Sequence, residues 1–135
     1  QEISSAASKV SAVPEVRAFL LDLQRNIARK NNVIMDGRDV GTVILPNAEV
    51  KIFLTANVEV RARRRHRELM AKGLKTPDTF ERVLKEVAER DKADSERATA
   101  PLKPAEDAVL VDTSDMDFEQ SVQTVINIIR RKVNV

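Results

Sequence analysis

The chain has 135 residues, of which 42% are hydrophobic, and this is enough for one ordinary domain with a buried core. It has no Cys, Trp or Tyr and one His, so disulfide scaffolds, thiol nucleophiles, cysteine-rich zinc sites and His-based triads are excluded or short of residues. Lys and Arg total 23 against 21 Asp and Glu, so the net charge of +2 gives no global basic field for nucleic acid. Chemistry in this chain therefore depends on Arg, Lys, Asp, Ser and backbone amides.

The sequence shows no sign of a membrane span or a targeting segment. No run approaches the roughly 18 apolar residues that a membrane helix needs, and the first residues lack the charged and apolar regions of a signal peptide. We expect a cytoplasmic protein with no membrane partner, which the absence of Cys fits. The chain also begins at Gln1, without Met and inside a polar segment, which favours a fragment or a processed product.

Helical and strand patterns alternate along the first and last parts of the chain. Apolar residues spaced by three and four predict a helix over residues 14–30, with Pro14 in its first turn. Short apolar runs predict strands at residues 33–35, 50–54 and 108–111. Strands separated by helices favour a parallel α/β sheet.

Three further helices are predicted from caps and periodicity. Asn57 can cap a helix that runs to about residue 72 and ends at Gly73. Asp78 and Glu81 resemble a capping box that opens the next helix, which runs through residue 89 or beyond. An apolar stripe predicts a closing helix over residues 118–133.

The motif DGRDVG at residues 36–41 follows the first predicted strand directly. Ligands of parallel α/β folds bind at that edge of the sheet, so this motif is the best candidate site. Gly37 permits close backbone approach, Arg38 offers a planar fork to a phosphate or carboxylate, and the two acids, Asp36 and Asp39, can hold a metal shell or accept hydrogen bonds. The alternative is a charged turn with a local Arg–Asp pair.

Five arginines fall within the seven residues 61–67. On a helix, three of them share one face and suit a polyphosphate: Arg61, Arg64 and Arg65. The alternative is a solvated basic face or a nonspecific nucleic-acid patch. No aromatic residues lie between these arginines for base stacking, which weakens the interpretation as a nucleic-acid patch.

The inward face of the helix that begins near residue 79 changes from apolar to charged along its length. Its apolar part comprises Phe80, Val83, Leu84 and Val87, and the same stripe continues through Arg90, Asp91, Asp94 and Arg97. Buried charges are costly unless they are paired or bound to something. The pattern therefore indicates either a ligand-facing helix end or a structural Arg–Asp network beyond the core edge.

Taken together, the segments VIMDGRDVGTVILPNAEVKIFLTA, RARRR and ERDKADSERATAPLKPAEDAVLVDT resemble the C-terminal two thirds of bacterial cytidylate kinases (CMP kinases). The similarity covers essentially all 135 residues. It implies phosphoryl transfer from ATP to CMP or dCMP with Mg²⁺, in a monomer with the P-loop nucleoside-monophosphate kinase fold. That fold is three-layered, with a parallel sheet, helices on both faces and a mobile lid, and here it would be incomplete.

The resemblance also implies residue roles. Arg38 resembles the residue that grips the CMP phosphate, and Asp36 resembles a strand-end acid near magnesium. The other acceptor residues are similar to those that read the cytosine (Ser8, Arg17 and Asp39), to ribose contacts (Arg90 and Asp94) and to a residue at the base or the transferring phosphoryl (Arg97). Arg61, Arg64 and Arg65 resemble lid residues, in a lid at about residues 61–79, that close over the ATP phosphates.

One part of the family pattern is missing, because no G-x-x-x-x-G-K-[ST] occurs and the chain has only three Gly. In the family the P-loop and a small acceptor insert lie N-terminal to the matched region. We therefore expect residues 1–135 to be the C-terminal part of one kinase domain, inactive alone, with that N-terminal part as its partner. A standalone anion-binding or nucleotide-binding interaction domain without catalysis is the alternative.

The family's P-loop strand would lie between the strands predicted at residues 33–35 and 50–54. Without it, two strand edges would keep unpaired backbone groups. We expect these edges to pair with each other, recruit another chain or stay partly disordered.

Overall fold

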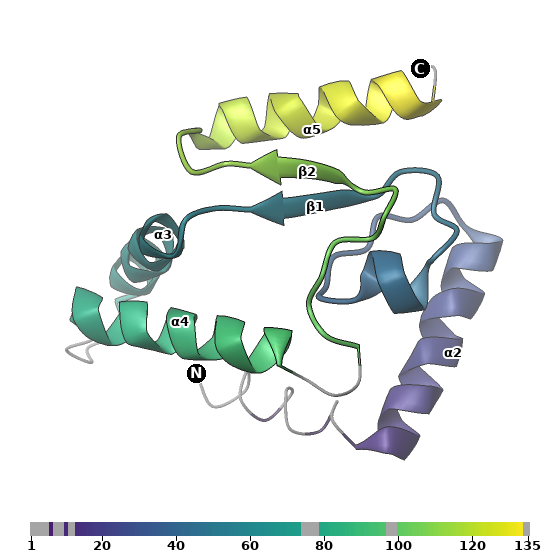
Figure 1. Cartoon of the computed structure of the whole chain (residues 1–135), viewed down its shortest axis with the longest axis horizontal. Coiled ribbons are helices and arrows are strands. Elements are labelled where there is room, and N and C mark those ends of the chain that lie inside the picture. Colours follow the sequence, from purple (N-terminus) through teal and green to yellow (C-terminus); the bar gives the residue numbers. More distant parts are fainter. Residues whose placement is uncertain (1–5, 7–9, 11–12, 74–78, 97–99, 134–135) are drawn as a thin grey trace.

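The computed structural model describes residues 6, 10, 13–73, 79–96 and 100–133 (Figure 1). Its elements are α2 (Pro14–Lys30), the π-helical turn η1 (Val40–Ile44), β1 (Ile52–Thr55), α3 (Val58–Ala71), α4 (Phe80–Ser95), β2 (Val109–Asp112) and α5 (Phe118–Val133). In the described ranges no helix has both the length and the apolar character that a membrane crossing needs.

The sheet consists of β1 and β2, which pair in parallel in a register that sets Ile52 opposite Val109 and Thr55 opposite Asp112. Backbone bonds of 2.9 Å extend the ladder at both ends, from the Val109 N–H to the Lys51 carbonyl and from the Thr113 N–H to the Thr55 carbonyl. The chain crosses from one strand to the other through α3 and α4, and α5 then runs back beside β2 (Figure 1). The predicted strands at residues 50–54 and 108–111 and the α/β class are confirmed, with both strands ending at one edge.

The strand predicted at residues 33–35 is not formed, so this prediction was wrong for the described chain. The segment belongs to no helix or strand in the structure, and Ile34 is 96% exposed. An apolar run becomes a strand only where a neighbouring strand accepts and donates its backbone hydrogen bonds. In the part of the chain that the structure describes, β1 and β2 pair only with each other. Residues 33–35 therefore have no neighbouring strand to pair with.

Helix α2 has the predicted bounds and is held to the rest of the protein mainly by polar contacts. Arg25 donates to the carbonyls of Val43, at 2.7 Å, and Ile44, at 3.1 Å, both in η1. Its apolar stripe is largely uncovered by the described residues, since Phe19 is 68% exposed and Leu23 is 45% exposed. The helix thus positions the 36–41 loop through hydrogen bonds more than through packing.

Helices α3 and α4 have local start and stop signals. The Asn57 side chain accepts the Glu59 N–H at 2.8 Å, and Gly73 follows the helix with φ +64°, a conformation that favours glycine. Helix α4 is capped by Thr79, whose hydroxyl accepts the Arg82 N–H at 3.3 Å. Thr79 therefore fills the capping role expected of Asp78, which lies outside the described residues.

The α3–α4 pair encloses a small core. Ala62, Leu69 and Val83 are buried, and Phe80, Leu84 and Val87 pack against them. This confirms the apolar half of the predicted α4 stripe. Because the core lies at one end of α4, it leaves the other end of that helix available for the charged residues of the site.

Val83→Ala tests this core, because Val83 is 1% exposed. Loss of two methyl groups and the resulting cavity should lower the free energy of unfolding by about 2 kcal/mol, measured by urea denaturation. The matched control is Val122→Ala on α5, where the side chain is 40% exposed and the change should be well under half as large. Equal losses in the two variants would contradict the assignment of this core.

Candidate functional site

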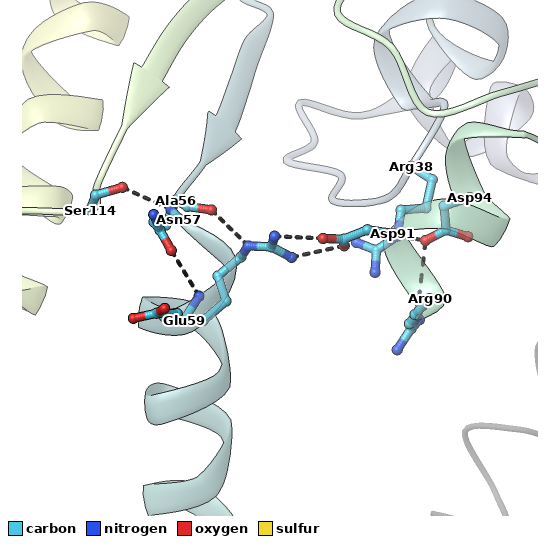
Figure 2. Close-up of polar contacts among 9 residues, drawn as sticks. Arg38, Ala56, Asn57, Glu59, Arg90, Asp91, Asp94 and Ser114 are labelled. Atoms are coloured by element: carbon cyan, nitrogen blue, oxygen red, sulfur yellow. Dashed lines mark hydrogen bonds and ion pairs between the residues drawn. The ribbon is translucent and has the colours of Figure 1, made fainter. Parts of the chain in front are cut away.

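The first part of the candidate site joins the 36–41 loop to the end of α4 (Figure 2). The Arg38 Nε donates to Asp94 Oδ2 at 2.7 Å, and the Arg90 Nε lies 3.9 Å from the same oxygen. The Asp94 side chain is only 15% exposed, whereas Arg38 and Arg90 are 44% and 60% exposed. This carboxylate therefore holds two guanidinium groups, from segments far apart in sequence, at a surface where an anion could reach them.

The loop itself is shaped by Gly37 and by backbone bonds to Asp39. A Cβ at Gly37 would lie 2.8 Å from Val40 Cγ2, so a larger residue would require the Val40 side chain or the loop to shift. The Asp39 carbonyl accepts the N–H groups of Val43 and Ile44 and starts η1. These contacts fix where the loop places Arg38 and the Asp39 carboxylate.

Arg17 of α2 forms an ion pair with Asp39, which is buried at 8% exposure. Sequence reasoning placed these two residues in one subsite, and the structure brings them together. Burial makes an unpaired carboxylate costly, so Asp39 needs a partner such as this guanidinium. The pair offers a carboxylate acceptor beside a planar donor, a combination that can recognise an amine or an amide edge.

Arg61 of α3 forms the second part of the site. Its Nη1 and Nη2 donate to the two oxygens of Asp91 on α4, at 2.8 and 2.6 Å, and its Nε donates to the Ala56 carbonyl at 2.8 Å (Figure 2). The hydrogen bonds from Arg61 hold the pKa of Asp91 below its usual range, against the opposing effect of partial burial, and the same bonds raise the pKa of Arg61. The charges of Arg38 and Arg90 also lower the pKa of Asp91.

The other two arginines of the predicted face point to different partners. Arg64 donates to the Thr113 hydroxyl at 3.0 Å, the Thr113 carbonyl at 2.6 Å and the Met116 carbonyl at 3.1 Å. Arg65 bonds Glu68 on its own helix at 2.8 Å. The structure thus divides the three arginines among separate acceptors and does not gather them around one point.

An open hollow of about 640 Å³ lies where β1 and β2 end. Asn57, Arg63, Asp112 and Ser114 are among its lining residues. The Asn57 N–H donates to the Ser114 hydroxyl at 2.8 Å, and this hydroxyl donates to Asp112 at 2.5 Å, which lowers the pKa of Asp112. Sequence analysis noted Asn57 as a helix cap and Arg63 among the clustered arginines but assigned no site here. The polar Asp-Thr-Ser run at the end of β2 was the available signal.

Asp36, the predicted metal-side acid, is exposed at the end of the 33–35 segment. Among the described residues no group of three or more acids or histidines is placed to hold a metal ion. One carboxylate is still enough for a magnesium ion that arrives bound to phosphates and water. The described residues therefore fit magnesium as part of a nucleotide complex better than as a resident ion. Ser8 and Arg97, two further predicted site residues, lie outside the described residues.

The Arg61–Asp91 pair should make stability depend on pH in acid. The folded pKa of Asp91 lies below its unfolded value, so the stabilisation is present above about pH 4 and is lost as pH falls through the folded pKa. The stabilisation by this pair should stay below about 1 kcal/mol, because solvent screens two side chains that are 34% and 37% exposed. Thermal unfolding between pH 7 and 2 should show a steeper acid loss for the wild type than for Asp91→Asn, and parallel curves would contradict the pairing.

Comparison with known proteins connects this geometry to a family. The chain matches the family model "Cytidylate kinase" over residues 1–131. It is 54% identical over 134 residues to a cytidylate kinase of Carboxydothermus hydrogenoformans, covering 99% of this chain and 60% of that protein. It is 50% identical over 128 residues to a cytidylate kinase of Exiguobacterium sp., covering 95% of this chain and 56% of that protein.

The chain therefore spans less than two thirds of the length of these curated relatives. The match runs through the DGRDVG loop, the arginine-rich helix and the charged end of α4, which together make up the site described above. On this evidence, the chain belongs to the cytidylate kinase family.

Proposed function

We propose that this sequence supplies the acceptor-nucleotide and lid residues of a kinase that transfers the γ-phosphoryl group of ATP to CMP or dCMP. The main support for the proposal is that the guanidinium groups of Arg38 and Arg90 both lie beside the Asp94 carboxylate at the protein surface. The chain also belongs to the cytidylate kinase family. Guanidinium groups from two segments, held by one carboxylate, make a surface suited to the phosphate and sugar of a nucleotide.

In this proposal the acceptor site has three functions. Arg38 binds the CMP phosphate, because a planar fork matches phosphate oxygens, and Arg97 acts at the base or the transferring phosphoryl group. Arg90 and Asp94 contact the ribose. Asp39 accepts from the exocyclic amine of cytosine, with Arg17 opposite it, so that uracil, which has a carbonyl there, is disfavoured, and Ser8 is the third residue that reads the base.

The lid at residues 61–79 binds the donor. Phosphoryl transfer depends on positioning and charge neutralisation, and arginines supply both. Arg64 and Arg65 would move from their present partners toward the phosphates of magnesium-bound ATP. Arg61 would meet the same phosphates while it stays bound to Asp91, and Asp36 would touch the magnesium through water. The left-handed Gly73 at the end of α3 is a natural hinge position.

The proposal needs a second segment, because this sequence has no P-loop. A P-loop contributes the amide cradle, the Lys and the hydroxyl that hold the β- and γ-phosphates and magnesium. We propose that residues 1–135 form one part of a single three-layer kinase domain, that this part is inactive alone, and that the complete enzyme is a cytoplasmic monomer.

The test measures ATP-dependent CDP formation by residues 1–135 alone and after fusion to the N-terminal P-loop segment of the Carboxydothermus hydrogenoformans relative. We expect no turnover by residues 1–135 and turnover by the fusion. Turnover by residues 1–135, with contaminating kinase excluded, would contradict the need for a P-loop. A folded fusion that binds CMP without turnover would favour a binding domain over a kinase.

Asp39→Asn tests base selection in the same fusion. An amide can donate to the uracil carbonyl where the carboxylate cannot, so the ratio of kcat/KM for CMP to that for UMP should fall by roughly tenfold or more. The matched control is Asp107→Asn, which removes the exposed partner of Lys51 and should leave the ratio unchanged. An unchanged ratio in Asp39→Asn would mean that another residue reads the base.

A further inference from the structure

Arg61 is the most completely restrained arginine among those with described partners in the site. All three of its guanidinium nitrogens donate hydrogen bonds, two to Asp91 and one to the Ala56 carbonyl, at 2.6 to 2.8 Å. Arg38, by contrast, bonds Asp94 through Nε alone among the contacts described. The plane of the Arg61 guanidinium is therefore set by two fixed points, the Ala56 carbonyl just after β1 and one carboxylate of α4.

Asp91 occupies the position on α4 where the two halves of the site meet. It follows Arg90 directly and lies three residues before Asp94, so it is on the same face of the helix as Asp94. On that face Asp94 receives Arg38 from the loop and Asp91 receives Arg61 from α3. Asp91 thus joins the arginine-rich helix to the segment that carries the acceptor residues.

We propose that Asp91 is a positioning residue for the phosphoryl transfer: it orients the Arg61 guanidinium and fixes its place relative to Arg90, Asp94 and Arg38. The inference rests on the proposed function, since it assigns the purpose of this orientation to phosphate binding. A flexible arginine side chain loses much rotamer freedom when it binds a ligand. A bidentate carboxylate restricts that freedom before the ligand arrives, so less is lost on binding.

A purely structural role fits the packing less well. The two side chains are 34% and 37% exposed, and ion pairs this exposed contribute little to stability. The α3–α4 pair already has its own apolar core around Val83. The pair is therefore not needed to hold the two helices together. Among the described contacts, however, Asp91 is the one partner that binds two nitrogens of the Arg61 guanidinium.

The test is a double-mutant cycle in the fused kinase. Asp91→Asn should lower kcat by roughly tenfold to a hundredfold, the effect of a misplaced catalytic group, and leave KM for CMP within about twofold of the wild type. In an Arg61→Ala background the same change should alter kcat by less than about twofold, because there is no guanidinium left to orient. The matched control, Asp107→Asn, breaks the bidentate Lys51 contact and should change neither constant.

Equal losses of kcat from Asp91→Asn in both backgrounds, or a raised KM for CMP with unchanged kcat, would overturn the inference. If the wild-type fusion is folded but inactive, the proposed function fails, and the orientation itself is read by ¹⁵N NMR. Slow rotation of the Arg61 guanidinium in the wild type and in Asp107→Asn, with fast rotation in Asp91→Asn, would support the positioning role. Slow rotation that persists in Asp91→Asn would overturn it.

Discussion

The arginine–aspartate pairs near the end of α4 fix side chains that apolar packing does not position. Asp94 binds Arg38 across 56 residues and Asp91 binds Arg61 across 30. The apolar core of the α3–α4 pair is small, and α2 touches the rest of the described chain mainly through Arg17 and Arg25. Directional charge pairs therefore set the position of the 36–41 loop against α2 and α4 and the orientation of Arg61, and the candidate site consists of those same pairs.

A site built from ion pairs is organised before any ligand binds, yet its charges are already partly neutralised. A ligand phosphate must compete with or share these partners. Guanidinium groups make this possible, since each has five N–H donors and one carboxylate rarely uses all of them. Arg38 gives Asp94 a single Nε bond and keeps most of its donors for other acceptors, whereas Arg61 uses all three nitrogens. The two residues are thus suited to different tasks, direct binding and oriented charge.

Sequence patterns predicted the features that depend on neighbours along the chain. The bounds of α2, the Asn57 cap and the break at Gly73 all arise from residues within one or two turns. The segment at residues 33–35 shows the limit, because its apolar run has strand character but a strand also needs a distant partner. The η1 turn was not predicted either, since its bonds to the Asp39 carbonyl have no simple signature.

For the site, the charged continuation of the α4 stripe correctly indicated that Asp91 and Asp94 face other segments. Which arginine meets which aspartate could not be derived, because it depends on how α3 crosses α4 and where the loop ends. The placement of Arg61, Arg64 and Arg65 on one helix face suggested one shared target. Their actual partners lie on α4, at the end of β2 and on α3 itself, since side chains on one helix face can reach in three directions.

The apolar surface that remains gives the two-segment proposal a physical basis. Phe19 and Leu23 on α2, Ile34 in the unpaired segment and Leu54 on β1 are each between 45% and 96% exposed in the described structure. Several large apolar side chains this exposed favour coverage by further protein. In the proposed kinase the P-loop segment would cover it, so the piece that completes the phosphate site would also complete the core. Catalysis and folding would then depend on the same contact. The P-loop segment would hold the ATP phosphates that the arginines neutralise, and it would also supply the strand that pairs with residues 33–35 and β1.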